Sequence, residues 1–321
     1  IIPDEDTVVV LTKGGYIKRT NPSEYRQQKR GGIGVHDLNT KEEDFITTLL
    51  TATTHNDVLF FTNAGKVYQS KMFEIPEGKR ATKGKSIMNF LPLTQGEEIT
   101  SVLALPKAAR EIKDLALLMV TKNGIVKKAS AQSFIDVRRS GIIALKLKKG
   151  DALLSAMLVE KGDTIVLSSA KGQAIRFKES DARVMGRTAS GVRAMRLRGG
   201  DSVVGADVVR SKFKEPHLLS VSEKGYGKRT PLEEYRTTAR GGKGIYTIKV
   251  TERNGPVVNC LQVNDNDDLM LMTSSGKVMR FKVAEVGVIG RLTAGVRLIN
   301  VDEGEKVIGI ARVVTFEGEE V

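Results

Sequence analysis

The stretch "LLMVTKNG", residues 117–124, passes from an apolar run into a threonine that stands three positions before a glycine. In an S/T-x-x-G turn the hydroxyl caps the first position, and the glycine takes the positive φ that closes the turn. The stretch therefore predicts a β-strand that ends in a tight hairpin.

The same pattern occurs six times in the 321 residues of the chain. The six copies end at Gly15, Gly65, Gly124, Gly172, Gly225 and Gly276. Successive glycines are 50, 59, 48, 53 and 51 residues apart. A regular period of this length predicts one structural unit that is repeated six times.

Each unit continues in the same way after its hairpin. A second glycine follows the turn glycine by 19 residues in five units and by 17 in the third. These second glycines are Gly34, Gly84, Gly141, Gly191, Gly244 and Gly295. Behind each comes an alternating run such as "VRAMRL", which is typical of a half-buried strand, then a turn rich in glycine and acid, then a last apolar strand. The pattern predicts four strands per unit.

Six four-stranded units predict an all-β, propeller-like disc, because radial repetition hides the sheet edges and lets blades pack on one another. We expect a single domain over residues 1–321 with blades at about 7–56, 57–114, 115–162, 163–216, 217–267 and 268–314, and an acidic tail at 315–321. A β-solenoid is the alternative, but its coils usually repeat every 20–30 residues or so. The Trp-bearing signature of WD40 and kelch propellers is missing, since the chain has no Trp. Short helical turns are expected only within 21–28, 180–186 and 231–238.

Composition limits the function. The chain has 51 Lys+Arg against 38 Asp+Glu, a net charge of +13, which favours a polyanionic partner. Cys260 is the single cysteine, so an intrachain disulfide is impossible and a reducing compartment is expected, with Cys260 as a buried, inert thiol. The start "IIPDEDTVVV" is neither a signal peptide nor a complete N-terminus, so we expect a domain of a longer chain. The apolar runs are too short to cross a bilayer.

Cations recur in register at two places in the unit. The first cationic position lies four residues after the turn glycine and holds Arg19, Gln69, Lys128, Arg176, Arg229 and Arg280. The second lies four residues before the second glycine and holds Arg30, Arg80, Arg187, Arg240 and Arg291, with Arg138 and Arg139 nearby in the third unit. Equivalent positions of a repeat occupy equivalent places, so these charges are expected to form a belt that binds the phosphates of bent double-stranded DNA. The alternative is a structural role, in which the side chains pack between blades.

The heptad "QKRGGIG", residues 28–34, sets two cations among three glycines. Glycines let a backbone approach a phosphate closely and offer N–H donors, while Lys29 and Arg30 supply charge. The stretch predicts a phosphate-binding loop; a flexible loop with two incidental cations is the alternative.

The repeats and this heptad resemble the C-terminal domain of the DNA gyrase A protein, whose signature box is Q-R-R-G-G-R/K-G in the same loop. The resemblance extends from Thr7 to about Val314. Lys29 is a conservative departure from the box and Ile33 replaces a cation, while a partial copy, "ARGGKG" at 239–244, supplies Lys243. The residues that match the box are Gln28, Arg30, Gly31, Gly32 and Gly34.

The resemblance implies a six-bladed β-pinwheel, in which neighbouring blades exchange a strand and DNA wraps around a basic rim, with the box where the first and last blades meet. Wrapping of fixed handedness then lets the enzyme introduce negative supercoils. The implied partners are double-stranded DNA, the N-terminal cleavage domain of the same chain and the gyrase B protein in an A2B2 assembly, in the bacterial cytoplasm at the nucleoid and without a membrane. No cofactor or metal is implied in this domain, since ATP and Mg belong to other domains.

Three alternatives remain open at this stage. The DNA-cleaving protein of topoisomerase IV has a similar C-terminal domain with a degenerate or absent box. A propeller that serves as a protein-interaction scaffold would have mixed or acidic rim loops. An autonomous enzyme is disfavoured, because there is no Walker A motif or acid/base pair, and His36, His55 and His217 lie far apart without ligand spacing.

Overall fold

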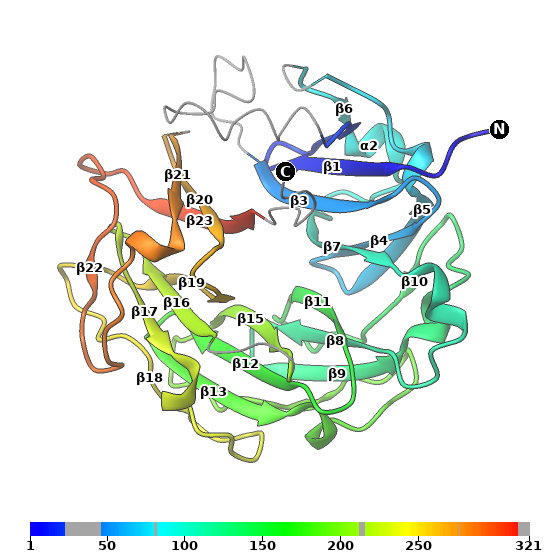
Figure 1. Ribbon diagram of the computed structural model, residues 1–321. Coiled ribbons are helices and arrows are strands. Elements are labelled where there is room, and N and C mark those ends of the chain that lie inside the picture. Colours follow the sequence, from blue (N-terminus) through cyan, green and yellow to red (C-terminus); the bar gives the residue numbers. More distant parts are fainter. Residues whose placement is uncertain (23–45, 80–81, 212–215, 276, 314–321) are drawn as a thin grey trace.

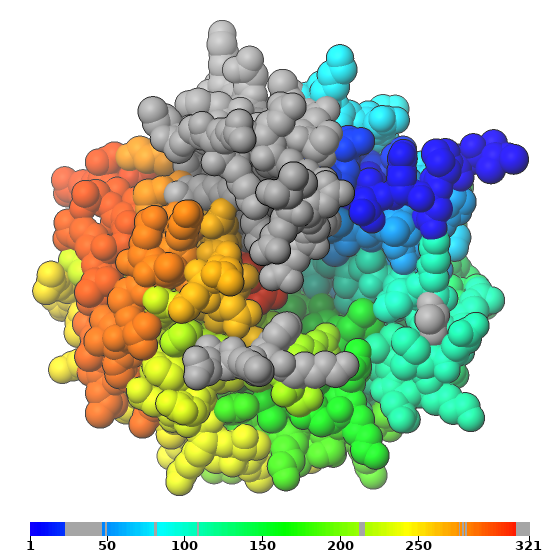
Figure 2. All heavy atoms as spheres, viewed as in Figure 1, coloured from blue at the N-terminus to red at the C-terminus, as the bar shows by residue number. Residues whose placement is uncertain are grey.

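The computed structural model describes residues 1–22, 46–79, 82–211, 216–275 and 277–313. The strands form six antiparallel sheets that succeed one another around a centre, as the blades of a propeller do (Figure 1). In the space-filling view the colours follow the chain around the disc from blue to red (Figure 2). The predicted all-β, six-bladed architecture is confirmed.

Three strands of each blade come from its own unit. In the first three blades they are β1 (Asp6–Thr12), β2 (Tyr16–Thr20) and β3 (Ile46–Thr53); β4 (Asp57–Thr62), β5 (Lys66–Lys71) and β7 (Ile99–Leu105); β8 (Ala116–Thr121), β9 (Ile125–Ser130) and β11 (Leu153–Val159). In the last three blades they are β12 (Thr164–Ser169), β13 (Gln173–Lys178) and β15 (Val203–Val209); β16 (His217–Ser222), β17 (Tyr226–Pro231) and β19 (Val257–Val263); β20 (Asp268–Thr273), β21 (Val278–Lys282) and β23 (Val307–Val313).

A fourth, two-residue strand is supplied by the following unit. These exchanged strands are β6 (Lys85–Ser86), β10 (Ile142–Ile143), β14 (Val192–Arg193), β18 (Ile245–Tyr246) and β22 (Val296–Arg297), which pair with β2, β5, β9, β13 and β17. The strand exchange that the resemblance implied is therefore present in five blades. Among the described residues the sixth sheet has three strands, in the order β21-β20-β23.

The strand order fixes which edge of each blade faces outward. The last long strand of each blade lies innermost, and these strands contact their neighbours around the ring, with β23 against β3 where it closes. The exchanged strands lie at the opposite edge of each sheet, on the outside of the disc (Figure 1). The outer edge of five blades is thus covered by the next unit, which removes an exposed strand edge.

A strap leads to each exchanged strand, and we use this name for residues 75–86, 135–143, 182–193, 235–246 and 286–297. Four straps also form an isolated parallel bridge with the strand they cover, as Val288 does with Arg229. The second glycine makes the close approach possible: Gly244 has φ +75°, and a Cβ there would lie 2.3 Å from the carbonyl oxygen of Ala174. No other residue type fits this place without displacing the backbone.

Among the described residues, helices are confined to short turns. They are α2 (Ile87–Phe90) and the 3₁₀ turns η2 (Met72–Glu74), η3 (Lys107–Arg110), η4 (Ala131–Phe134), η5 (Glu179–Asp181), η6 (Leu232–Glu234) and η7 (Val283–Glu285). η6 lies within the predicted segment 231–238 and η5 overlaps the start of 180–186, whereas most of the segment 21–28 lies outside the described residues. The other short turns were not predicted from the sequence. Within the described part, no helix has the length and apolar character needed to cross a bilayer.

The predicted hairpin turn is confirmed in the described copies. In the quoted stretch, the Thr121 hydroxyl accepts a hydrogen bond from the Ile125 backbone N–H at 3.2 Å, and Gly124 has φ +83°. The turn glycines of the first, second, fourth and fifth units also have positive φ.

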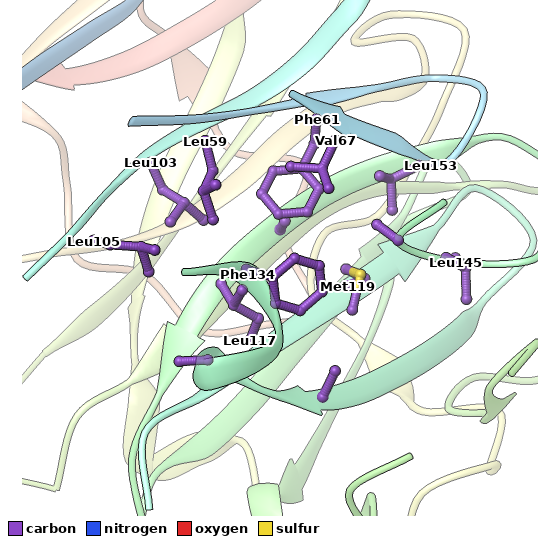
Figure 3. Packing of buried hydrophobic residues seen from close by; sticks show 14 of the residues in the cluster. Leu59, Phe61, Val67, Leu103, Leu105, Leu117, Met119, Phe134, Leu145 and Leu153 are labelled. Carbon is purple, nitrogen blue, oxygen red and sulfur yellow. The ribbon is translucent and has the colours of Figure 1, made fainter. Parts of the chain in front are cut away.

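The apolar core lies between successive blades. Between the second and third blades, Phe61 and Phe134 have ring centroids 6.2 Å apart and are fully buried with Leu59, Leu117 and Met119 (Figure 3). Similar clusters fill the other four interfaces from the first blade to the sixth. The four middle sheets are therefore covered on both faces, and their central strands are continuous apolar runs. Cys260 lies in one of these clusters, 2% exposed as predicted, and burial raises the pKa of its thiol.

Candidate nucleic-acid interface

The first cationic position lies where one blade meets the strap of the next. The Arg229 side chain is 7% exposed, and its Nε donates to the Val286 carbonyl at 2.7 Å, just after η7. Arg19 makes the same contact to Ile75 at 3.3 Å. These guanidinium groups fasten each blade to the 3₁₀ turn of its successor.

Two further residues at this position reach the equivalent turns. The Arg176 Nη1 donates to the carbonyls of Leu232 and Tyr235 at 3.2 and 3.3 Å. Lys128 is 9% exposed, and its Nζ binds both the carbonyl and the carboxylate of Glu179.

Gln69, the uncharged residue at the first cationic position, indicates which contact this position requires. Its amide nitrogen donates to the Ile135 carbonyl at 2.8 Å, and its amide oxygen accepts from the Val137 N–H at 2.7 Å. A neutral amide therefore makes the same contact between blades as the cations do. The shared requirement is a donor for a buried carbonyl, which would otherwise be left unpaired at a cost of about 1–3 kcal/mol.

The structure thus supports the structural alternative at the first cationic position. Instead of standing on an open surface belt, Lys128 and Arg229 are buried between blades and Arg19 and Arg176 are half-buried there. DNA contact by these four residues stays a prediction. Arg280 belongs to β21, but its side chain lies outside the described part.

Three lysines that the sequence did not single out precede this position and anchor the straps. Lys228 is fully buried, and its ammonium group donates to the carbonyls of Gly290 and Arg291 at 2.7 and 2.6 Å and to the Thr293 hydroxyl at 3.1 Å. Lys127 binds the carbonyls of Ala144 and Arg187. Lys18 binds those of Lys79 and Thr82. Each buried ammonium group holds the loop that contains the second cationic position of the next unit.

Burial lowers the pKa of both Lys127 and Lys228 to about 8, with the nearby Arg187 guanidinium adding to the effect at Lys127. Since an unfolded lysine titrates near pH 10.4, the folded protein releases these protons first, and the unfolded chain binds more protons between about pH 8 and 10. We therefore expect the free energy of unfolding to rise with pH across this window.

Urea unfolding at pH 7.5 and pH 9.5 measures this rise. A Lys127→Met, Lys228→Met variant should be less stable at both values but should show a smaller rise. An equal rise in the wild type and the variant would contradict the assignment of the shifted protons to these lysines.

Among the cations that the sequence singled out, the exposed ones lie at or beside the second cationic position. Arg138, Arg139 and Arg187 are exposed on their straps, and Lys243 is exposed in the partial box copy. Arg240 and Arg291 are half-buried, and each donates to a carbonyl of the preceding exchanged strand, at Arg193 (2.9 Å) and at Tyr246 (3.0 Å). DNA contact by all six stays a prediction.

Backbone hydrogen bonds join successive straps into one band. The Arg196 N–H donates to the Gly242 carbonyl at 2.8 Å, and the Lys249 N–H donates to the Thr293 carbonyl at 2.9 Å. Each bond links the residues that follow one exchanged strand to the next strap. The band therefore runs along the outer edge of consecutive blades.

This band has an extreme charge composition. The five straps contain fourteen Lys or Arg and only two acidic residues, Glu77 and Asp136. The cations are Lys79, Arg80, Lys83, Lys85, Arg138, Arg139, Arg183, Arg187, Arg193, Arg236, Arg240, Lys243, Arg291 and Arg297. Several are out of register between units, so the repeat did not mark them. The outer edge of the disc is a positively charged band that suits a polyanion.

Several predicted positions lie outside the described residues. They are Arg80, the box residues Gln28, Lys29, Arg30, Gly31, Gly32 and Gly34, and the acidic tail at 315–321. The phosphate-binding role of the box stays a prediction.

The fold and its rim define a strand-exchanged, six-bladed β-propeller with a basic outer edge. The chain matches the family model described as "DNA gyrase C-terminal domain, beta-propeller" at residues 6–53, 56–106, 116–160, 163–210, 216–264 and 267–313. The chain belongs to this family.

Curated relatives and solved structures agree with this assignment. The chain is 44% identical to the DNA gyrase A protein of Lawsonia intracellularis, covering 96% of this chain and 37% of that relative, and 44% identical to the DNA gyrase A protein of Escherichia coli, covering 98% and 35%. A solved DNA gyrase A C-terminal domain superposes with a TM-score of 0.79 at 29% identity, covering 97% of this chain and all of the other. The C-terminal domain of DNA topoisomerase IV also gives 0.79, at 25% identity, covering 98% and 94%. The chain thus spans little more than a third of the length of these curated relatives.

Proposed function

We propose that the chain binds double-stranded DNA along the straps and bends it around the disc with fixed handedness, as the wrapping domain of a bacterial DNA gyrase. The observation that supports this most directly is the charge of the straps at the outer edge, where the described residues include thirteen cations against two acids. Neutralising DNA phosphates with such cations releases counterions, which supplies affinity without reading sequence.

The continuity of the band supports bending as well as binding. Curving a 20–30 bp site requires about 1–6 kcal/mol, which contacts along the curved path must exceed. A band that follows consecutive blades offers such a path, whereas an isolated cluster of cations does not. A scaffold for protein partners would need no such excess of cations.

The activity of the whole enzyme is part of the proposal. Supercoiling would use ATP and Mg held by other domains, with none bound by this chain, and would require the N-terminal cleavage domain and the gyrase B protein at the bacterial nucleoid. The heptad at residues 28–34 favours gyrase over topoisomerase IV.

A titration of plain duplex DNA at several salt concentrations tests the proposal. If six to ten phosphates are neutralised, the logarithm of the binding constant should fall against log salt with a slope of about −5 to −9, independently of sequence. A slope shallower than about −2 would contradict binding along the rim.

A further inference from the structure

Two arginines converge on one tyrosine at the outer edge of the fifth blade. Tyr226 is the first residue of β17, and it pairs with Arg297 on the exchanged strand β22. Arg253 lies in the turn between β18 and β19. The group therefore combines two residues of the fifth unit with one that the sixth unit supplies.

Both guanidinium groups bind the same phenol oxygen. Arg253 Nε donates to the Tyr226 hydroxyl oxygen at 3.0 Å, and Arg297 Nη2 donates to it at 2.7 Å. Each guanidinium carbon also lies 5.2 Å from the centroid of the tyrosine ring. The phenol is 3% exposed, whereas both arginines are exposed. The tyrosine fixes the two cations from beneath and leaves their outer faces to solvent.

The charge of this group is not balanced by the residues around it. Neither guanidinium forms an ion pair with a carboxylate in the part of the chain that the structure describes, and the neutral Asn300 side chain accepts from Arg297 at 3.0 Å. Hydrogen bonds from Arg297 and then Arg253 lower the pKa of Tyr226, which reflects the excess of positive charge around its oxygen. Two like charges held together in this way repel, and an anion between them removes the repulsion.

Related pairs occur at other outer edges. Arg198 donates to the Tyr246 hydroxyl at 2.8 Å and lies 5.3 Å from the centroid of its ring, and Tyr246 belongs to the exchanged strand β18. Lys83 lies 4.0 Å above the ring of Tyr16, where β6 pairs with β2. Only the fifth blade places two cations on one phenol in this way among the residues described. This makes it the best-formed anion site of the three.

We propose that Tyr226, Arg253 and Arg297 form a clamp for a single backbone phosphate of duplex DNA, a specific site that rests on the proposed function. The guanidinium groups donate to the phosphate oxygens, since planar forks of N–H donors suit phosphate geometry. Tyr226 is a positioning residue, because it holds both arginines at one point and does not itself reach the exposed surface.

The test compares Arg253→Gln, Arg297→Gln and the double variant with the wild-type chain in duplex titrations at several salt concentrations. Each single variant should raise Kd about tenfold, which corresponds to one charged hydrogen-bonded contact. Because both arginines serve one phosphate, the slope of the logarithm of the binding constant against log salt should become shallower by about 0.9 in the double variant. Two separate phosphates would make it shallower by roughly 1.8. Arg110→Gln is the matched control: this exposed arginine is already paired with Asp136 at 3.1 Å, so its Kd and slope should not change.

The outcomes separate the clamp from the proposed function. With a steep salt dependence in the wild type, two results for the double variant would overturn the clamp. One is a Kd and slope like those of the wild type. The other is a slope shallower by about 1.8, with a Kd increase equal to the product of the two single increases. A shallow wild-type slope would instead overturn DNA binding along the rim.

An affinity-independent readout is the ionisation of Tyr226, followed by ¹³C NMR of its phenol carbon with thermal melting as the folding control. Bound duplex should raise the pKa of Tyr226, since a phosphate competes for both guanidinium groups, and an unchanged pKa in the complex would overturn the clamp.

Discussion

Replacing Arg229 by leucine is expected to lower the free energy of unfolding by about 2–3 kcal/mol, because the Val286 carbonyl loses its donor inside the interface between two blades. Asp265, which also contacts this guanidinium, is 67% exposed and can be solvated without it. The loss therefore comes mainly from the contact between blades. Urea unfolding of the variant and the wild type at one pH measures it.

Arg229→Gln is the matched variant, since Gln69 makes the equivalent contact with an amide. It should lose less than about 1 kcal/mol, and it should leave the salt slope of DNA binding unchanged, because the predicted role is structural. Equal destabilisation by leucine and glutamine would contradict the contact between blades. A slope reduced by about 0.9 in Arg229→Gln would show that this guanidinium does bind a phosphate.

The sequence predicted the repeat and its blades because their causes are local. A glycine such as Gly124 is needed wherever φ is positive, and a continuous apolar run such as that of β8 is needed wherever a strand is covered on both faces. These requirements recur in every unit, so they appear as a period. Strand exchange leaves no such local mark, and it was anticipated only from the resemblance.

The roles of the cations could not be predicted in the same way. Lys228 and Arg229 are adjacent in the basic run "GKRT", yet one is bonded to the strap loop and the other to the turn after η7. Neighbouring residues of a strand point to opposite faces, so two adjacent cations have different surroundings. A long cationic side chain has the same sequence signature whether it reaches solvent or a carbonyl of the next blade. Gln69 was the available signal, since an uncharged residue in register suggests a hydrogen bond more than a phosphate contact.

Neutralising the exposed rim cations should have the largest effect on function. We expect a variant with Arg138, Arg139, Arg187 and Lys243 all changed to glutamine to fold normally, because these side chains are exposed on or beside the straps. The slope of the logarithm of its binding constant against log salt should be shallower by about 3.6, and the variant should no longer hold DNA along a curved path. The matched control changes four exposed lysines outside the straps, Lys113, Lys122, Lys149 and Lys161, to glutamine, which alters the net charge equally. If both variants bound and bent DNA alike, net charge rather than its placement on the straps would be responsible.

Wrapping is tested most directly by closing nicked circular DNA with ligase in the presence of the chain, removing the protein and resolving the topoisomers. DNA that follows the rim with fixed handedness is constrained, so the wild-type chain and the control variant should shift the mean linking number in one direction as protein is added. The rim variant should give little or no shift at the same protein concentrations, with thermal melting confirming that it is folded. A wild-type distribution that matches the protein-free one at saturating protein would contradict the claim that this domain wraps DNA.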